Sequence, residues 1–157
     1  MSELLEKIPP QNLEAEQSTL GSMMIDGGAL EKGVEVLKPQ DFYRDAHQQI
    51  FGAFVSLAGR NEPVDIRTLQ EELRSGSRLD AVGGTEYLMA LIDSVPTAAN
   101  IEYYAEIVRE KSRLRRLLDL LNMSTRAVYA SDTTADEIAA SLSDSGDGHH
   151  HKTLAWP

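Results

Sequence analysis

The sequence predicts an all-α protein with a globular helical head followed by a protruding helical hairpin, formed by a long helix and a short one. Apolar residues recur every three or four positions along most of the 157-residue chain, as on one face of an amphipathic helix. No stretch shows the two-residue alternation of a half-buried strand. Residues 100–130 contain neither proline nor glycine, and would form a rod on the order of 45 Å long.

The chain opens with a predicted arm, residues 1–11, ending in Pro9 and Pro10. Two consecutive prolines block a continuous helix and favour an extended entry. Asn12 is the expected N-cap of a first helix, which runs to about Ile25. The sequence Asp-Gly-Gly that follows is expected to break this helix.

The remainder of the predicted head, residues 12–99, alternates amphipathic segments with turn residues. We expect further helices at 29–37, 45–58, 66–74 and 86–95. Asp65 and Thr85 are the expected N-caps of the last two helices. Large apolar residues on the segment 45–58 are expected to supply much of the core volume: Ile50, Phe51, Phe54, Val55 and Leu57.

Two apolar stripes run along the long helix. One contains Ile101, Tyr104, Ala105 and Val108, and it stops near Arg109, so this half is expected to pack on the head. The other follows a seven-residue repeat and continues to the end of the helix. We call this second stripe the seam, and it contains Tyr103, Ile107, Leu114, Leu117, Leu118, Leu121 and Val128. A seam that one helix cannot bury predicts a partner helix or a second subunit, whereas an ordinary long core helix is the alternative.

A short amphipathic helix is predicted after the long one. Thr134 and Glu137 have the spacing of a capping box at its start. Residues 100–143 would therefore form a helical hairpin. The composition of residues 144–157 predicts a tail, which is either a native linker or vector-encoded sequence.

Composition excludes several classes of function. The chain has no cysteine, so disulfides, thiolate metal sites and cysteine nucleophiles are ruled out. Its formal net charge of -10 opposes binding to nucleic-acid phosphates unless the charges are segregated. No apolar run approaches the length that spans a membrane. The acidic N-terminus does not resemble a secretory signal, so we expect a cytoplasmic protein.

The motifs of common catalytic sites are missing. There is no phosphate-binding G-x-x-x-x-G-K-[ST], no G-x-G-x-x-G, no H-E-x-x-H and no G-x-S-x-G. His47, the single histidine outside the tail, is expected to be a hydrogen-bonded structural or surface residue. Three consecutive histidines at 149–151 would hold a metal only adventitiously. We therefore predict no catalytic, cofactor-binding or metal-binding residues.

A basic cluster in the middle of the long helix has two interpretations. Its cations could pair with acids on neighbouring helices, or they could form a patch for an acidic protein partner or for nucleic acid. No aromatic residue lies within the cluster, which argues against stacking on bases. The members of this basic cluster are Arg109, Lys111, Arg113, Arg115 and Arg116.

Four blocks in consistent order resemble one family. They are PPQNLEAEQSTLGSMMID at 9–26, DFYRDAHQQIF at 41–51, NEPVDIRTLQEEL at 61–73 and VGGTEYLMALIDSVPTAANIEYYAEIVREK at 82–111. Together they are similar to the N-terminal domain of DnaB-type replicative DNA helicases. The resemblance covers residues 9–128. The stretch after Leu142 carries no signature of the family, and a plasmid or phage helicase remains an alternative origin.

The resemblance implies a function in assembly. In this family the domain dimerises through its helical hairpin, the dimers form a trimer of dimers as a collar on the hexamer, and the collar docks the C-terminal domain of primase. ATP and Mg would be needed only by a separate motor domain, which this sequence lacks, so no catalysis is expected here. A helical nucleic-acid-binding regulator that uses the basic cluster, or a small helical enzyme, are the alternatives from other classes.

Overall fold

The computed structural model describes residues 7–144 of the chain. All regular structure within these residues is helical, which confirms the predicted fold class. The chain divides into two compact units, residues 1–113 and residues 114–157. We call their described parts the head unit (7–113) and the hairpin unit (114–144). The division falls inside the long helix, so the head unit includes the first turns of that helix.

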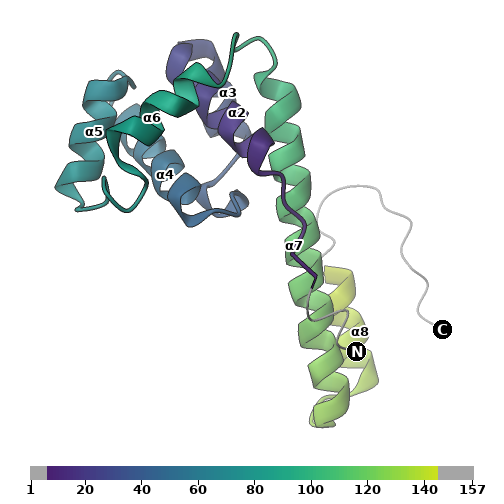
Figure 1. Ribbon diagram of the computed structural model, residues 1–157. Helices are drawn as coiled ribbons and strands as arrows, with labels where there is room; N and C mark the ends of the chain where they lie inside the picture. The colour runs from purple at the N-terminus through teal and green to yellow at the C-terminus, as the bar shows by residue number, and fades with distance from the viewer. Residues whose placement is uncertain (1–6, 145–157) are drawn as a thin grey trace. The chain divides into compact units, whose positions relative to one another are not determined.

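The elements follow one another with short connections (Figure 1). In chain order they are α2 (Leu13–Ile25), α3 (Gly27–Val36), the 3-10 helix η1 (Pro39–Asp41), α4 (Asp45–Gly59), α5 (Ile66–Ser75), α6 (Gly84–Asp93), α7 (Ile101–Ala130) and α8 (Ala135–Asp144).

Helix α2 lies at the centre of the head unit, against α3, α4 and α6, and α5 packs on α4 and α6 (Figure 1). The core between them contains the fully buried side chains of Phe42, Phe51 and Phe54. The rings of Phe42 and Phe51 lie 5.0 Å apart between centroids. The prediction that α4 supplies much of the core volume is confirmed, except that Val55 is 38% exposed.

The first stripe of α7 belongs to this core. Ile101, Ala105 and Val108 are all at most 6% exposed, and Tyr104 packs against the same cluster. This half of α7 is also tied by a buried hydrogen bond, in which the Ser112 hydroxyl donates to the Asp41 carboxylate at 2.7 Å. The expectation that the first stripe packs on the head is therefore confirmed.

Two predicted caps are present. The Asn12 side chain accepts a hydrogen bond from the Ala15 N–H at 2.9 Å, at the start of α2. Asp65 accepts from the Thr68 N–H at 2.9 Å, and the Thr68 hydroxyl in turn accepts from the Asp65 N–H at 3.0 Å. Each arrangement satisfies backbone donors that the first helical turn leaves without partners.

Two predicted helix starts are wrong by two residues each. Helix α3 begins at Gly27 because Asp26, extended at φ -146°, caps it by accepting from the Ala29 N–H at 2.9 Å. Helix α6 begins at Gly84, since Gly83 adopts a left-handed φ of 106° that a residue with a side chain rarely reaches. Thr85 is thus no cap; its hydroxyl accepts from the Gln70 side-chain amide at 2.9 Å.

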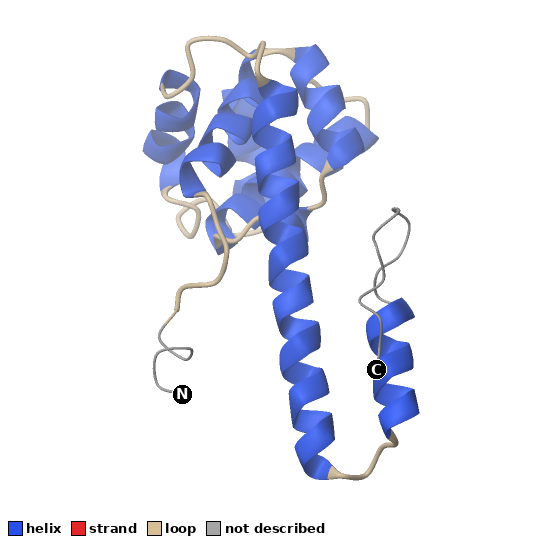
Figure 2. Ribbon diagram, turned by 90° about the vertical axis from the view of Figure 1, so that its right-hand side faces the viewer, coloured by secondary structure: helices blue, strands red, loops and turns tan. Residues whose placement is uncertain are grey.

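The hairpin unit consists of the second half of α7, a connection at residues 131–134, and α8, which runs back along α7 (Figure 2). Ser131 turns the chain with a left-handed φ of 57°. The predicted capping box is present, with Thr134 and Glu137 joined by two reciprocal bonds of 3.3 Å. Asp144, assigned to the tail from sequence, is the last residue of α8, and the rest of the predicted tail lies outside the described residues.

Candidate functional site

The part of the seam in the hairpin unit is open to solvent. Helical spacing places its members on one face of α7. Their side chains are between 38% and 60% exposed. They are Leu114, Leu117, Leu118, Leu121 and Val128. A continuous apolar face of this kind is typical of a surface that another protein covers.

The part of the seam in the head unit differs. Ile107 is half-buried and packs against the core of the head unit. Tyr103 is 67% exposed, and its ring lies edge-on to Tyr104 with 5.5 Å between centroids. The seven-residue repeat therefore continues across both units, but Ile107 is already partly covered within a single chain.

A second face of α7 is half-buried within the hairpin unit. Leu120, Ser124 and Ala127 are half-buried and recur at the spacing of one helix face, and Ile138 of α8 is 8% exposed. We infer that this face meets α8 within the hairpin unit. At 100° per residue its centre lies about 90° from the centre of the seam. Two neighbours at right angles are the arrangement of a helix in a four-helix bundle. Sequence reasoning missed Leu120, although its spacing from Ala127 was a usable signal.

The basic cluster does not form one face. Arg109, Arg113 and Arg116 follow a spacing of four and three residues, whereas Lys111 and Arg115 share a different face of α7. Arg113 also forms an ion pair with Glu110 at 3.5 Å. The cluster is thus divided around the helix instead of concentrated on one side.

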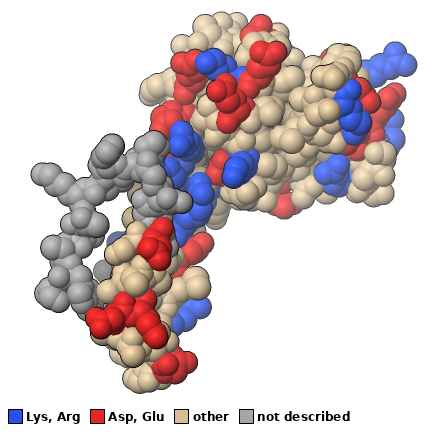
Figure 3. All heavy atoms as spheres, turned by 180° about the vertical axis from the view of Figure 1, so that it is seen from behind, with Lys and Arg blue, Asp and Glu red and all other residues tan. Residues whose placement is uncertain are grey.

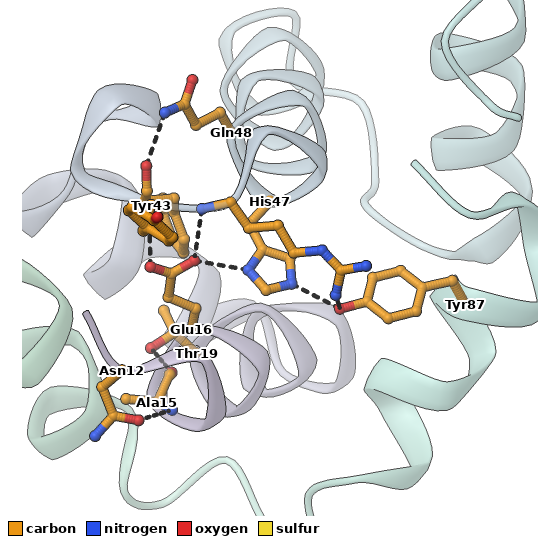
Figure 4. A network of polar contacts seen from close by, with 10 residues as sticks. Asn12, Ala15, Glu16, Thr19, Tyr43, His47, Gln48 and Tyr87 are labelled. Atoms are coloured by element: carbon orange, nitrogen blue, oxygen red, sulfur yellow. Dashed lines mark hydrogen bonds and ion pairs between the residues drawn. The ribbon is translucent and has the colours of Figure 1, made fainter. Parts of the chain in front are cut away.

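A buried polar network joins three helices of the head unit, and sequence reasoning missed it. Glu16 and His47 are almost completely buried, and His47 Nδ1 lies 2.7 Å from the Glu16 carboxylate (Figure 4). His47 Nε2 lies 2.6 Å from the Tyr87 hydroxyl. Glu16 also accepts from the backbone N–H of Tyr43 at 2.7 Å. His47 is therefore a structural residue, one of the two roles expected from sequence, and is not at the surface.

The nature of this network is structural. Glu16 lies in the first turn of α2, and its carboxylate also accepts from the backbone N–H groups of Tyr43 and Arg44, in the connection between η1 and α4. A buried carboxylate with several donors is satisfied, so removing it would leave those donors without partners. The sequence offers no signal for these contacts, because His47 lies 31 positions from Glu16 and 40 positions from Tyr87.

Residues 7–144 contain no group of three or more histidine, cysteine or acidic side chains that could hold a metal ion. In the same part of the chain, no helix is both long and apolar enough to cross a membrane.

Comparison with known proteins identifies the family. The sequence model of the family described as DnaB-like helicase N terminal domain matches residues 8–110 of this chain. This chain belongs to that family. The crystal structure of the N-terminal domain of DnaB helicase from Mycobacterium tuberculosis superposes with a TM-score of 0.81 at 43% identity, covering 87% of this chain and 99% of that domain.

Longer relatives contain the same domain. The replicative DNA helicase DnaB of Geobacillus stearothermophilus is 50% identical over 145 residues, which cover 92% of this chain. The replicative DNA helicase DnaC of Bacillus subtilis (strain 168) is 48% identical over the same length. In both cases the chain spans 31% of the relative's length.

Proposed function

We propose that this chain is the assembly and partner-docking domain of a hexameric replicative DNA helicase, and that two copies associate through their hairpin units. The observation that carries the proposal is the exposed seam at Leu114, Leu117, Leu118, Leu121 and Val128. Pairing of two identical seams gives a symmetric dimer, and three such dimers form the proposed collar of the hexamer.

The energetics favour a partner for the seam. Fully burying a leucine or valine side chain contributes roughly 1.5 to 3 kcal/mol. The seam residues are partly covered already, so each copy would gain several kcal/mol by the same reasoning. Two copies together would then gain on the order of 10 kcal/mol, which is comparable with the cost of association. A dimer of micromolar affinity needs a net free energy of association of about -8 kcal/mol, so contacts beyond the seam residues would have to contribute as well.

Mutation of the seam tests the proposal. Leu114→Asp combined with Leu121→Asp places two charges on the seam, and we expect a folded monomer. The matched control is Met123→Asp combined with Ala130→Asp, which has the same charge change and the same seven-residue spacing on the opposite face of α7; both residues are exposed. Light scattering across a concentration series should give a dimer for the wild type and the control. A dimer that persists in the Leu114/Leu121 variant contradicts the proposal.

The remaining parts of the proposal concern the longer protein. We propose that ATP-dependent unwinding, with Mg, resides in a motor domain elsewhere in the longer protein, and that this chain hydrolyses no nucleotide. Turnover clearly above a buffer blank would contradict this.

The docking of a primase C-terminal domain is proposed on the family relationship, and a mixture of the two domains should show a heavier species by light scattering. Nucleic-acid binding is less favoured because the basic cluster is divided around α7.

A further inference from the structure

The phenol of Tyr87 lies at the outer end of the buried polar network. Its hydroxyl oxygen is 2.6 Å from His47 Nε2, and the other ring nitrogen, Nδ1, is 2.7 Å from the Glu16 carboxylate (Figure 4). Tyr87 is only half-buried, whereas Glu16 and His47 are inaccessible to solvent. A carboxylate, an imidazole and a hydroxyl in series are the arrangement by which enzymes activate a hydroxyl nucleophile.

The hydrogen-bond partners indicate the direction of each proton. The Glu16 carboxylate already accepts from the backbone N–H groups of Tyr43 and Arg44, as an ionised carboxylate does. Nδ1 of His47 therefore donates to Glu16, and the Nε2 lone pair of the neutral imidazole accepts from the Tyr87 hydroxyl. The Tyr87 oxygen in turn accepts from the Arg44 guanidinium at 3.3 Å, so its own proton remains directed at His47.

Arg44 places positive charge beside the same phenol oxygen. Its guanidinium carbon also lies 5.2 Å from the centre of the Tyr87 ring. A guanidinium is always charged in proteins, and here it would stabilise negative charge that develops on the oxygen when the proton leaves. Arg44 is exposed, which places this end of the network at the surface of the head unit.

We infer that Tyr87 is an activated nucleophile and a site of covalent modification by activated acyl donors, such as reactive esters. In this step the Tyr87 oxygen bonds to the acyl carbon, and its proton passes to His47 Nε2. The leaving group departs with the electron pair of the broken bond, and His47 then releases the proton to water. Glu16 positions the imidazole and stabilises the charge that it acquires. The inference does not depend on the proposed self-association.

Two other tyrosines provide an internal comparison. Tyr129 is 82% exposed and Tyr103 is 67% exposed, so both are more accessible than Tyr87. If accessibility alone decided reactivity, these two would react first. Preferential reaction at Tyr87 requires activation by its neighbours, whereas a network with a structural role alone predicts the reverse order.

An uncharged ester, p-nitrophenyl acetate, is the appropriate probe. The face of the head unit in Figure 3 carries both acidic and basic side chains, and the whole chain has a net charge of -10. Such charges steer charged reagents but not neutral ones. Peptide mass spectrometry after short exposures gives the acetylated fraction of each tyrosine. We expect Tyr87 to be acetylated about tenfold faster than Tyr129 or more, because a positioned general base contributes at least that much.

Three variants assign the roles of the side chains. Tyr87→Phe should abolish the fast acetylation and leave the reaction of Tyr129 unchanged. Arg44→Gln removes the exposed charge, and Glu16→Gln removes the buried charge but keeps an acceptor oxygen; each should slow the acetylation of Tyr87 about tenfold or more. Arg67→Gln, at an exposed position on α5, is the matched control for Arg44→Gln and should have no effect. Circular dichroism verifies that each variant is folded.

A solvent isotope experiment separates base catalysis from a contribution of Glu16 to stability alone. Acetylation of Tyr87 should be slower in deuterium oxide, because the proton moves to His47 as the oxygen attacks. Reaction of Tyr87 no faster than that of Tyr129 overturns the inference, and so do equal rates in the wild type and the Arg44→Gln and Glu16→Gln variants. Neither result bears on the proposed function, which light scattering tests separately.

Discussion

The head unit buries its largest apolar side chains, whereas the hairpin unit leaves most of its large apolar side chains exposed. In the head unit, Phe42, Phe51 and Phe54 are completely inaccessible to solvent. In the hairpin unit, Leu117 is 49% exposed and Val128 is 60% exposed. Burial of apolar surface is the dominant favourable term in folding. The head unit is therefore stabilised by its own core, whereas the hairpin unit leaves much of its apolar surface unburied within a single chain.

The largest effect should come from the aromatic core. Phe51→Ala removes a fully buried ring that contacts two other aromatic rings, and we expect it to lower the free energy of unfolding by about 3 to 5 kcal/mol. Leu117 lies in the hairpin unit and is half-exposed. When Leu117→Ala is added to the Leu114→Asp/Leu121→Asp variant, which is expected to be monomeric, the free energy of unfolding should change by about 0.5 kcal/mol or less. Urea denaturation followed by circular dichroism measures both. Similar losses for the two substitutions would remove the distinction between the units.

The buried polar network should give the next largest effect. Glu16→Ala leaves His47 and the Tyr43 N–H without their acceptor, and we expect a loss of about 3 kcal/mol. Glu16→Gln keeps an acceptor oxygen and should lose less. Equal stability of Glu16→Ala and the wild type in urea would mean that water replaces the carboxylate, and that the head unit is less tightly closed than its core indicates.

A pair of glycine substitutions tests how closely the helices of the head unit approach. A methyl group on Gly21 of α2 would clash with the carbonyl oxygen of Leu91 in α6 and with the side chain of Val95 just after it. We therefore expect Gly21→Ala to lower the free energy of unfolding by about 1 to 3 kcal/mol. Gly52 in α4 has open space at the same position, and Gly52→Ala should stabilise by up to about 1 kcal/mol because alanine favours the helix. Thermal unfolding of both variants checks the opposite signs.

The smallest effect concerns a surface ion pair of the head unit. The hydrogen bond from Arg60, at 2.6 Å, lowers the pKa of Glu72 below its ordinary value of 4.5. A lowered carboxylate pKa stabilises the fold above that ordinary value, and the contribution disappears as the pH falls through the folded-state pKa. Glu72→Gln should therefore be slightly less stable than the wild type at neutral pH and equally stable well below pH 4.5. Urea midpoints at both pH values test this; a difference that grows on acidification would contradict the assignment.

Local sequence signals predicted the helix limits well where a single residue or stretch determined them. Asn12 and Asp65 are caps, and the stretch without proline or glycine is a continuous helix. Predictions were wrong where two residues competed for one role. Thr85 is a good cap by type, but the left-handed backbone of Gly83 starts α6 earlier. Asp26 was assigned to a break because the glycines after it disfavour helices, yet its own carboxylate caps α3.

The sequence by itself determined the helical class, the limits of α7 and the apolar repeat of the seam, because each depends on residues close together in the chain. Only the tertiary structure decided which part of that repeat is covered within one chain. Ile107 packs on the core of the head unit, whereas Leu114 and Leu121 are exposed. It also decided the partnership of Glu16, His47 and Tyr87. Burial and hydrogen bonding between distant positions depend on how the helices pack, and helical periodicity carries no information about which helix lies opposite.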